Sequence, residues 1–321
     1  MAVQTDSYER AVEGIEETLG VRVNVTSLWR VVQEAGKAVR KRQQAEAQRA
    51  WGMPERGKVV KGETRLKKKM GAALDGVYIN LLKEGWKEVK IGAFFEIKPL
   101  SGSEKIRRLK HAGKPSQAEV EIRDMVRAEA ISYCAVLGSV EEFEPVQWSE
   151  AQKRQLPQCW DSVVIGDGAD WIDRIYATCY QESERIVDWY HACAHLGGLA
   201  RQAFGESNQV GHQWLGGRKD DLWRGQVHAV VDAIRGLDIM VDGREREANY
   251  FTKHQRGMNY LEFCERGLPV GSGVVEGGGC KGVIEGRMKR VGMRWSREGA
   301  HNMIALRCEH HSGRWQQIWA T

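Results

Sequence analysis

Three acidic residues lie beside or inside apolar segments, where a carboxylate is costly unless something neutralises it. Asp75 interrupts one apolar run, Asp167 ends a second, and Glu276 follows a glycine-containing turn. Two divalent cations about 4 Å apart need one bridging carboxylate and others that bind each ion separately. One ion would activate water or a sugar hydroxyl, and the other would stabilise the leaving oxygen. Such a set predicts phosphodiester chemistry with Mg²⁺ or Mn²⁺, two ions being expected.

The two aspartates also have a simpler interpretation. Asp75-Gly76 and Asp167-Gly168 are dipeptides of a kind that is frequent in turns. The glycines around Asp167 allow close backbone approach by a substrate, but they would serve a turn equally well. Spacing alone therefore leaves catalysis and turn formation both open.

Positive charge is concentrated on both sides of these acids, although the net charge is only +5. One cluster spans residues 40–69, and a second follows Glu276 and includes Lys281, Arg287, Lys289, Arg290, Arg294 and Arg297. Either cluster alone could be a solvated helix face. Both together favour a polyanion such as DNA, whose phosphates Lys281, Arg287 and Lys289 are expected to hold.

Composition places the chain among ordinary globular proteins, with 42% hydrophobic and 28% charged residues over 321 positions. Seven scattered cysteines, without a signal-peptide pattern, indicate a reducing cytoplasm. No apolar stretch approaches membrane-spanning length, so no membrane partner is expected. Five of the cysteines have apolar surroundings and predict buried thiols: Cys134, Cys159, Cys179, Cys264 and Cys308.

Hydrophobic periodicity predicts a mixed α/β sheet flanked by helices. The expected strands are residues 72–82, 89–97, 131–137, 163–165 and 185–187, with helices at 140–156 and 171–180. A helical insertion should follow, with helices at 191–204, 220–237 and 244–264. Helices at 276–290 and 300–311 complete the chain, and residues 99–118 are expected to form a polar loop.

The amino-terminal region predicts two helices within residues 8–48, joined near Gly20. Trp29 and Arg30, early in the second helix, are compatible with a DNA-binding helix-turn-helix. A plain helical hairpin explains the same pattern. Residues 38–70 are polar and basic, which predicts a helix tail and a linker.

Several blocks resemble a known family. They are residues 75–90, 166–172, 186–192, 271–276 and 287–295, and together they span most of residues 70–316. Their order and context are similar to those of ISKra-type insertion-sequence DDE transposases of bacteria. The resemblance implies an RNase H-like core in two parts (71–195 and 271–321), a helical insertion (196–270), a helix-turn-helix segment (1–50) and a linker (51–70). It also implies catalytic metal ligands Asp75, Asp167 and Glu276, and a homodimer on DNA at the nucleoid.

The chain departs from the family pattern at three places. Family members usually carry a longer amino terminus, often with a zinc-binding segment, and this chain is expected to lack it. Glycines 277–279 directly follow Glu276 and weaken an α-helix there, which leaves Glu285 as the fallback acid. Ala194 stands where the family often has an acid. An RNase H-like nuclease or resolvase without strand transfer, and an inactive DNA-binding remnant, are the alternatives.

Three further residues are auxiliary candidates. Asp188 could assist the other acids or could cap the helix that follows it. His191 and His195 lie one helical turn apart and could share a metal, although a structural or DNA-contacting role is favoured. Most tryptophans predict core or helix packing, namely Trp160, Trp171, Trp189, Trp214, Trp223 and Trp295. Trp295 could instead contact DNA by stacking on a base near the site.

Overall fold

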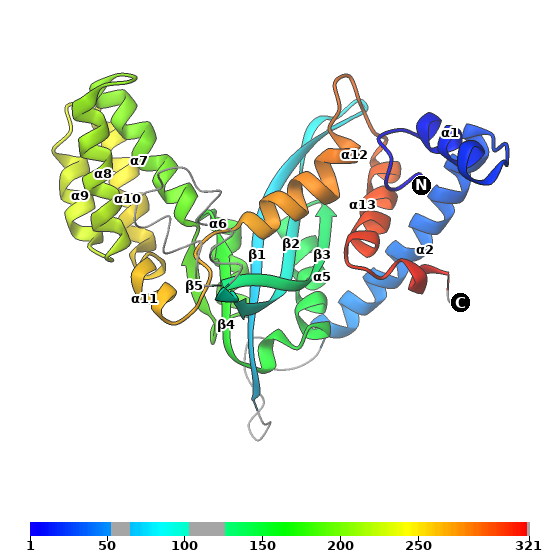
Figure 1. Ribbon diagram of the computed structural model, residues 1–321, viewed down its shortest axis with the longest axis horizontal. Helices are drawn as coiled ribbons and strands as arrows, with labels where there is room; N and C mark the ends of the chain where they lie inside the picture. The colour runs from blue at the N-terminus through cyan, green and yellow to red at the C-terminus, as the bar shows by residue number, and fades with distance from the viewer. Residues whose placement is uncertain (53–64, 103–125, 320–321) are drawn as a thin grey trace.

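A five-stranded mixed sheet forms the centre of the molecule (Figure 1). The computed structural model describes residues 1–52, 65–102 and 126–319. The strands are β1 (Leu66–Leu81), β2 (Gly85–Pro99), β3 (Val126–Leu137), β4 (Cys159–Gly166) and β5 (Glu184–Val187), in the order β3-β2-β1-β4-β5. The first three pair antiparallel, whereas β4 runs parallel to β1 and β5 parallel to β4. This α/β architecture is compatible with an RNase H-like fold and confirms the predicted fold class.

Alternate residues of β1 face two different helical layers. Ala73, Val77 and Ile79 belong to the core shared with η3 (Val274–Glu285) and α13 (Arg297–His311). Ala72 and Leu74 belong to a second core shared with α5 (Val140–Lys153) and α6 (Asp170–Cys179). Because a strand alternates its side chains, Asp75 points to the η3 side.

The helical insertion lies between β5 and η3 and forms a bundle beside the sheet (Figure 1). Its helices are α7 (Trp189–Phe204), α8 (Gln209–Trp223), α9 (Val227–Arg235), α10 (Val241–His254) and α11 (Tyr260–Glu265). The single helix predicted at 220–237 is wrong, since Gly225 adopts a φ of 73° between α8 and α9. The helix predicted at 244–264 is also interrupted, by a 3₁₀ turn at Gln255–Gly257.

Two amino-terminal helices pack beside the sheet layers. Gly20 ends α1 (Tyr8–Leu19) with a φ of 65°, and the Asn24 side chain caps α2 (Val25–Trp51). Helix α2 lies close against α13, where a Cβ on Gly36 would approach the Asn302 carbonyl oxygen to 2.6 Å. The predicted helix tail within residues 38–70 is confirmed, because α2 continues to residue 51, but the linker is corrected at its end, because β1 begins at residue 66. Residues 53–64, and residues 103–118 of the predicted loop, lie outside the described residues.

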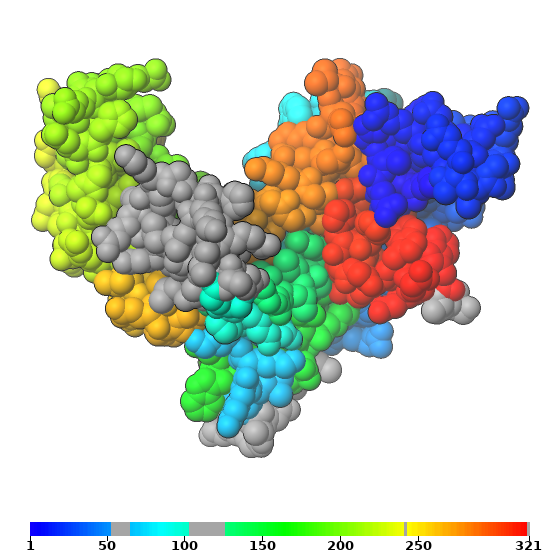
Figure 2. Space-filling model, viewed as in Figure 1, coloured from blue at the N-terminus to red at the C-terminus, as the bar shows by residue number. Residues whose placement is uncertain are grey.

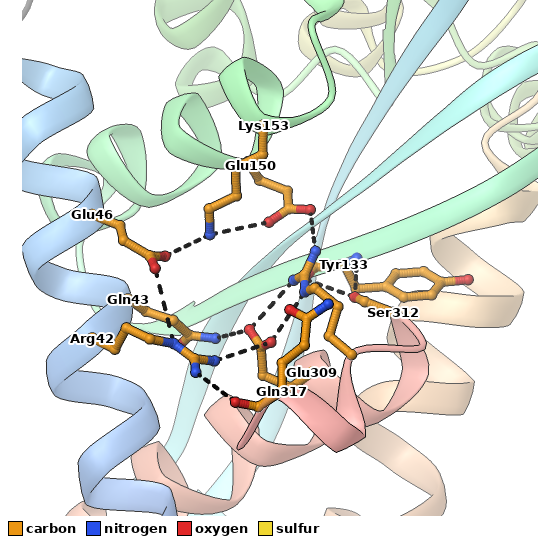
Figure 3. Close-up of polar contacts among 10 residues, drawn as sticks. Arg42, Gln43, Glu46, Tyr133, Glu150, Lys153, Glu309, Ser312 and Gln317 are labelled. Atoms are coloured by element: carbon orange, nitrogen blue, oxygen red, sulfur yellow. Dashed lines mark hydrogen bonds and ion pairs between the residues drawn. The ribbon is translucent and has the colours of Figure 1, made fainter. Parts of the chain in front are cut away.

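A network of buried charges fastens α2 to the core (Figure 3). Glu309 is 2% exposed and binds Arg314 at 3.0 Å, Arg42 at 3.3 Å and Gln43 at 2.8 Å. Arg314 also binds Glu150 of α5 at 2.7 Å. Burial alone would raise the pKa of Glu309, but Arg314 and Gln43 lower it below its ordinary value. Each buried carboxylate named here has a cationic partner, which fixes three helices in one arrangement.

Candidate active site

The sheet register brings Asp75 and Asp167 to the same level. In the parallel pair of β1 and β4, Ala73 lies opposite Ile165. Asp75 and Asp167 each follow two residues later. Asp167 comes directly after the end of β4, and Asp75 lies beside it within β1. Asp167 accepts a hydrogen bond from the Ala169 amide at 2.9 Å, which holds the start of α6. The two aspartates therefore lie at the same level of the sheet, and their sharing of a catalytic site stays a prediction.

Glu276 reaches the same region from η3. Cys280, one turn further along η3, lies 3.3 Å from the Asp75 carboxylate, which places this segment directly over β1. Ser272 Oγ donates to Glu276 Oε1 at 2.5 Å and fixes one orientation of that exposed side chain. The charges of Asp167 and Glu276 both act to raise the pKa of Asp75. Asp167 and Glu276 thus each lie close enough to Asp75 for their charges to act on it.

The η3 segment is a π-helix of 12 residues rather than the predicted α-helix. Hydrogen bonds from i to i+5 widen such a helix and bring residues four and five apart onto one side. The groove beside β1 is lined from η3 by Glu276, Cys280, Lys281 and Glu285, and from beyond it by Lys289. This winding explains how an acid followed by three glycines still faces the site.

Two of those glycines lie close against the sheet, and a Cβ would clash at the first of them. A Cβ on Gly278 would lie 2.0 Å from the Tyr133 hydroxyl of β3, and one on Gly279 would lie 3.1 Å from Ile91 of β2. Gly277, in contrast, has nothing within 4 Å of a Cβ. The glycines therefore let η3 approach the sheet, and they do not mark a broken helix.

The environment of Asp75 suits a divalent cation. Burial is the largest cause that raises its pKa, hydrogen bonds from the Gly76 amide and the Cys280 thiol lower it, and the two neighbouring acids raise it further. Burial and the Asp75 charge also raise the pKa of Cys280, so the thiol keeps its proton and donates a hydrogen bond to Asp75. A cation bound by carboxylate oxygens would remove the repulsion. Across the described residues, however, no group of three metal-binding side chains is already close enough to enclose an ion.

The predicted DNA-contacting residues divide into two groups. Lys281, Lys289, Arg290 and Arg294 are exposed, and the first two line the groove. Arg287 is only 2% exposed, because its guanidinium lies between the rings of Tyr8 and Trp295, 5.0 Å from each ring centroid. Trp295 is 8% exposed and donates its indole N–H to the Met288 carbonyl at 3.2 Å. Both predictions are corrected, since these side chains fill the interior instead of facing a ligand.

The auxiliary candidates have distinct positions. Asp188 is 1% exposed and caps α7 through the His191 amide at 2.6 Å, as one of its two interpretations predicts. It also accepts the Ser272 amide at 2.5 Å, so it holds the turn that leads to Glu276. His191 is exposed, and its ring lies 5.1 Å from that of His195. No third metal ligand joins the two histidines in the described part of the chain.

Two contacts near the site involve residues that the sequence does not single out. Tyr250 of α10 donates its hydroxyl to the Asp167 carbonyl at 3.0 Å. Glu247 binds His195 Nδ1 at 2.6 Å. Neither residue belongs to a recognisable motif, since both lie in a polar stretch of the insertion. Only the folded arrangement of α7 and α10 brings them to the site.

The remaining cysteine and tryptophan predictions are mostly confirmed. All five cysteines expected to be buried thiols are buried. Trp189 and Trp223 pack in the core with ring centroids 5.1 Å apart, but Trp160 is 71% exposed, so its predicted core position is wrong. Its place next to Cys159 at the start of β4 leaves its side chain outside the sheet layers.

A broad hollow separates the insertion from the η3 and α12 (Gly286–Met288) segments on one face of the molecule (Figure 2).

No family model matches this chain, and no curated protein matches it. In the part of the chain that the structure describes, no helix has the length and apolar character needed to cross a membrane. The site must therefore be interpreted from its own residues.

Proposed function

We propose that this chain is a DDE transposase of the ISKra type, which cleaves DNA strands at the ends of an insertion sequence and joins them to target DNA. The observation that carries the proposal is the convergence of Asp75, Asp167 and Glu276 from β1, β4 and η3. Their mutual repulsion at a partly buried position is the environment that a divalent cation would stabilise.

Each acid would have a defined task. Asp75 and Asp167 would hold Mg²⁺ or Mn²⁺ from the rigid sheet, and Glu276 would complete the set from η3. Bound cations would supply an activated nucleophile and charge stabilisation on the leaving oxygen. Lys281 and Lys289, exposed along the groove, would position the phosphate backbone of the strand being cut. Two copies on DNA, in the cytoplasm at the nucleoid, complete the proposal.

A cleavage and joining assay tests the proposal with DNA that carries the flanking ends of this reading frame. Wild-type protein should cut labelled ends in Mn²⁺ or Mg²⁺ and should join pre-cut ends to a plasmid. Asp167→Asn and Glu276→Gln should each lower both rates by about 10³-fold, because each removes a cation ligand. Asp232→Asn, an exposed acid of α9, is the matched control and should retain the wild-type rates.

The same assay separates the alternatives. Cleavage without joining of pre-cut ends would identify a nuclease or resolvase. No response to either cation, together with equal behaviour of the wild-type and Asp167→Asn proteins, would show a DNA-binding remnant and would sink the catalytic proposal.

A further inference from the structure

The insertion contacts the loop of Asp167 and the start of α6 through several side chains of α10, and one of them, Tyr250, bonds to Asp167 itself. Tyr250 of α10 donates its hydroxyl to the main-chain carbonyl of Asp167 at 3.0 Å. A phenol is protonated at neutral pH, so Tyr250 is a hydrogen-bond donor to the loop.

The next residue of the loop is shaped around the same ring. Gly168 has a φ of 93°, and a Cβ there would lie 3.0 Å from Tyr250 Cε2 and 3.1 Å from His254 Nε2. His254 itself is 8% exposed. The loop thus runs directly against α10, with a backbone conformation that favours glycine.

A second layer fixes the Tyr250 ring. The imidazole of His195 stacks on it with centroids 4.1 Å apart and an interplanar angle of 19°. Glu247 holds His195 Nδ1 at 2.6 Å, with side chains 13% and 28% exposed, respectively. Contacts therefore run without a break from α7 and α10 to the main chain of Asp167.

We infer that Tyr250 is a positioning residue, through which the helical insertion sets the orientation of Asp167 in the catalytic site. The contacts of Tyr250 are independent of the proposed function, but an effect on cation binding or catalysis rests on it. Tyr250 is 83 residues away from Asp167 in sequence, so the insertion becomes part of the site and not an appended module. Residues that orient a metal ligand typically change cation affinity by 10- to 100-fold when they are altered.

The test compares two tyrosine variants of the full chain. Tyr250→Phe keeps the stacked ring and removes the hydroxyl. Tyr176→Phe is the matched control, because Tyr176 donates a similar hydrogen bond to the Ser183 carbonyl at 2.9 Å. Amide hydrogen exchange of residues 166–172 should be about tenfold faster in Tyr250→Phe and unchanged in the control. The midpoint of Mn²⁺ binding, measured by calorimetry without DNA, should weaken about tenfold in Tyr250→Phe only.

Glu247→Gln supplies a second variant, with a smaller change expected in the same direction. Exchange and Mn²⁺ midpoints within twofold of wild type in Tyr250→Phe would overturn the inference. If wild-type protein binds no Mn²⁺, the proposed function fails instead, while the exchange comparison still decides whether α10 holds the Asp167 loop.

Discussion

Two groups of carboxylates in this molecule have opposite electrostatic surroundings. In the network of α2, α5 and α13, Glu309 and Glu150 share the cation Arg314 and are 2% and 3% exposed. At the proposed catalytic site, acids from β1, the end of β4 and η3 gather beside a thiol and a serine hydroxyl, and Asp75 keeps a raised pKa. Paired charges stabilise an arrangement, whereas like charges held together store repulsion that a ligand can release.

The largest expected effect is the separation of activity from stability at Asp75. Asp75→Asn should reduce strand cleavage by about 10³-fold, or about 4 kcal/mol in activation free energy, because a cation ligand is lost. The same change should raise the free energy of unfolding without cations by about 1 kcal/mol, since a charge that is partly buried and repelled by two neighbouring acids disappears. Chemical denaturation and a cleavage assay measure the two quantities. A less stable Asp75→Asn protein would contradict the idea of stored repulsion.

Removal of a charge from the network of α2, α5 and α13 should lower the free energy of unfolding. Arg314→Met leaves Glu150 and Glu309 buried without their shared cation, so we expect a loss of at least about 3 kcal/mol in unfolding free energy. Arg297→Met removes an exposed pair with Glu84, at 2.6 Å, and should cost less than about 1 kcal/mol. Urea denaturation of both variants makes the comparison. Equal losses would show that burial of the network has no special weight.

Packing of η3 should have an intermediate effect. Gly278→Ala forces a methyl group against the Tyr133 hydroxyl and should destabilise the fold by about 2 kcal/mol. Gly277→Ala meets nothing and should be neutral or stabilising by up to about 1 kcal/mol. Thermal unfolding of the two single variants tests this contrast. Identical melting temperatures would argue against the close approach of η3 to the sheet.

The smallest expected effect is the change in unfolding free energy between neutral and acidic pH. The pKa of Glu309 is below its ordinary 4.5, so its stabilisation is present above that value and is lost as pH falls through the lower folded pKa. The pKa of Asp75 is above its ordinary 3.8, so stability is gained as pH falls through the raised value. Glu309→Gln should flatten the acid loss and Asp75→Asn should remove the gain, each by about 1 kcal/mol. Denaturation series between pH 3 and 7 give both slopes.

The sheet and the placement of Asp75 and Asp167 on it could be predicted because their signals are local. Apolar runs mark each strand, and an acid within such a run is conspicuous at Asp75 and Asp167. The position of Arg287 could not be predicted, because the rings that enclose it come from Tyr8 and Trp295, at distant points of the chain. Charge alone suggested exposure there, and only tertiary packing shows otherwise.

The π-winding and the role of Tyr250 were hidden for different reasons. Residues 274–285 contain no signal that distinguishes i to i+5 bonding from an ordinary helix interrupted by glycine. Tyr250 acts through the main-chain carbonyl of Asp167, a group that every residue carries. Contacts of this kind leave no pattern in side-chain types.

The winding of η3 also has a consequence for protein engineering. A designer who transplants Glu276 and its neighbours onto an ordinary α-helical scaffold would keep the residue types and lose the geometry, because α-helical winding would turn Lys281 and Glu285 away from the acid. Grafts should instead preserve the four-and-five spacing, together with the glycine surface that packs on the sheet. A graft should therefore transfer η3 together with the sheet on which it packs, and not the residues of the motif alone.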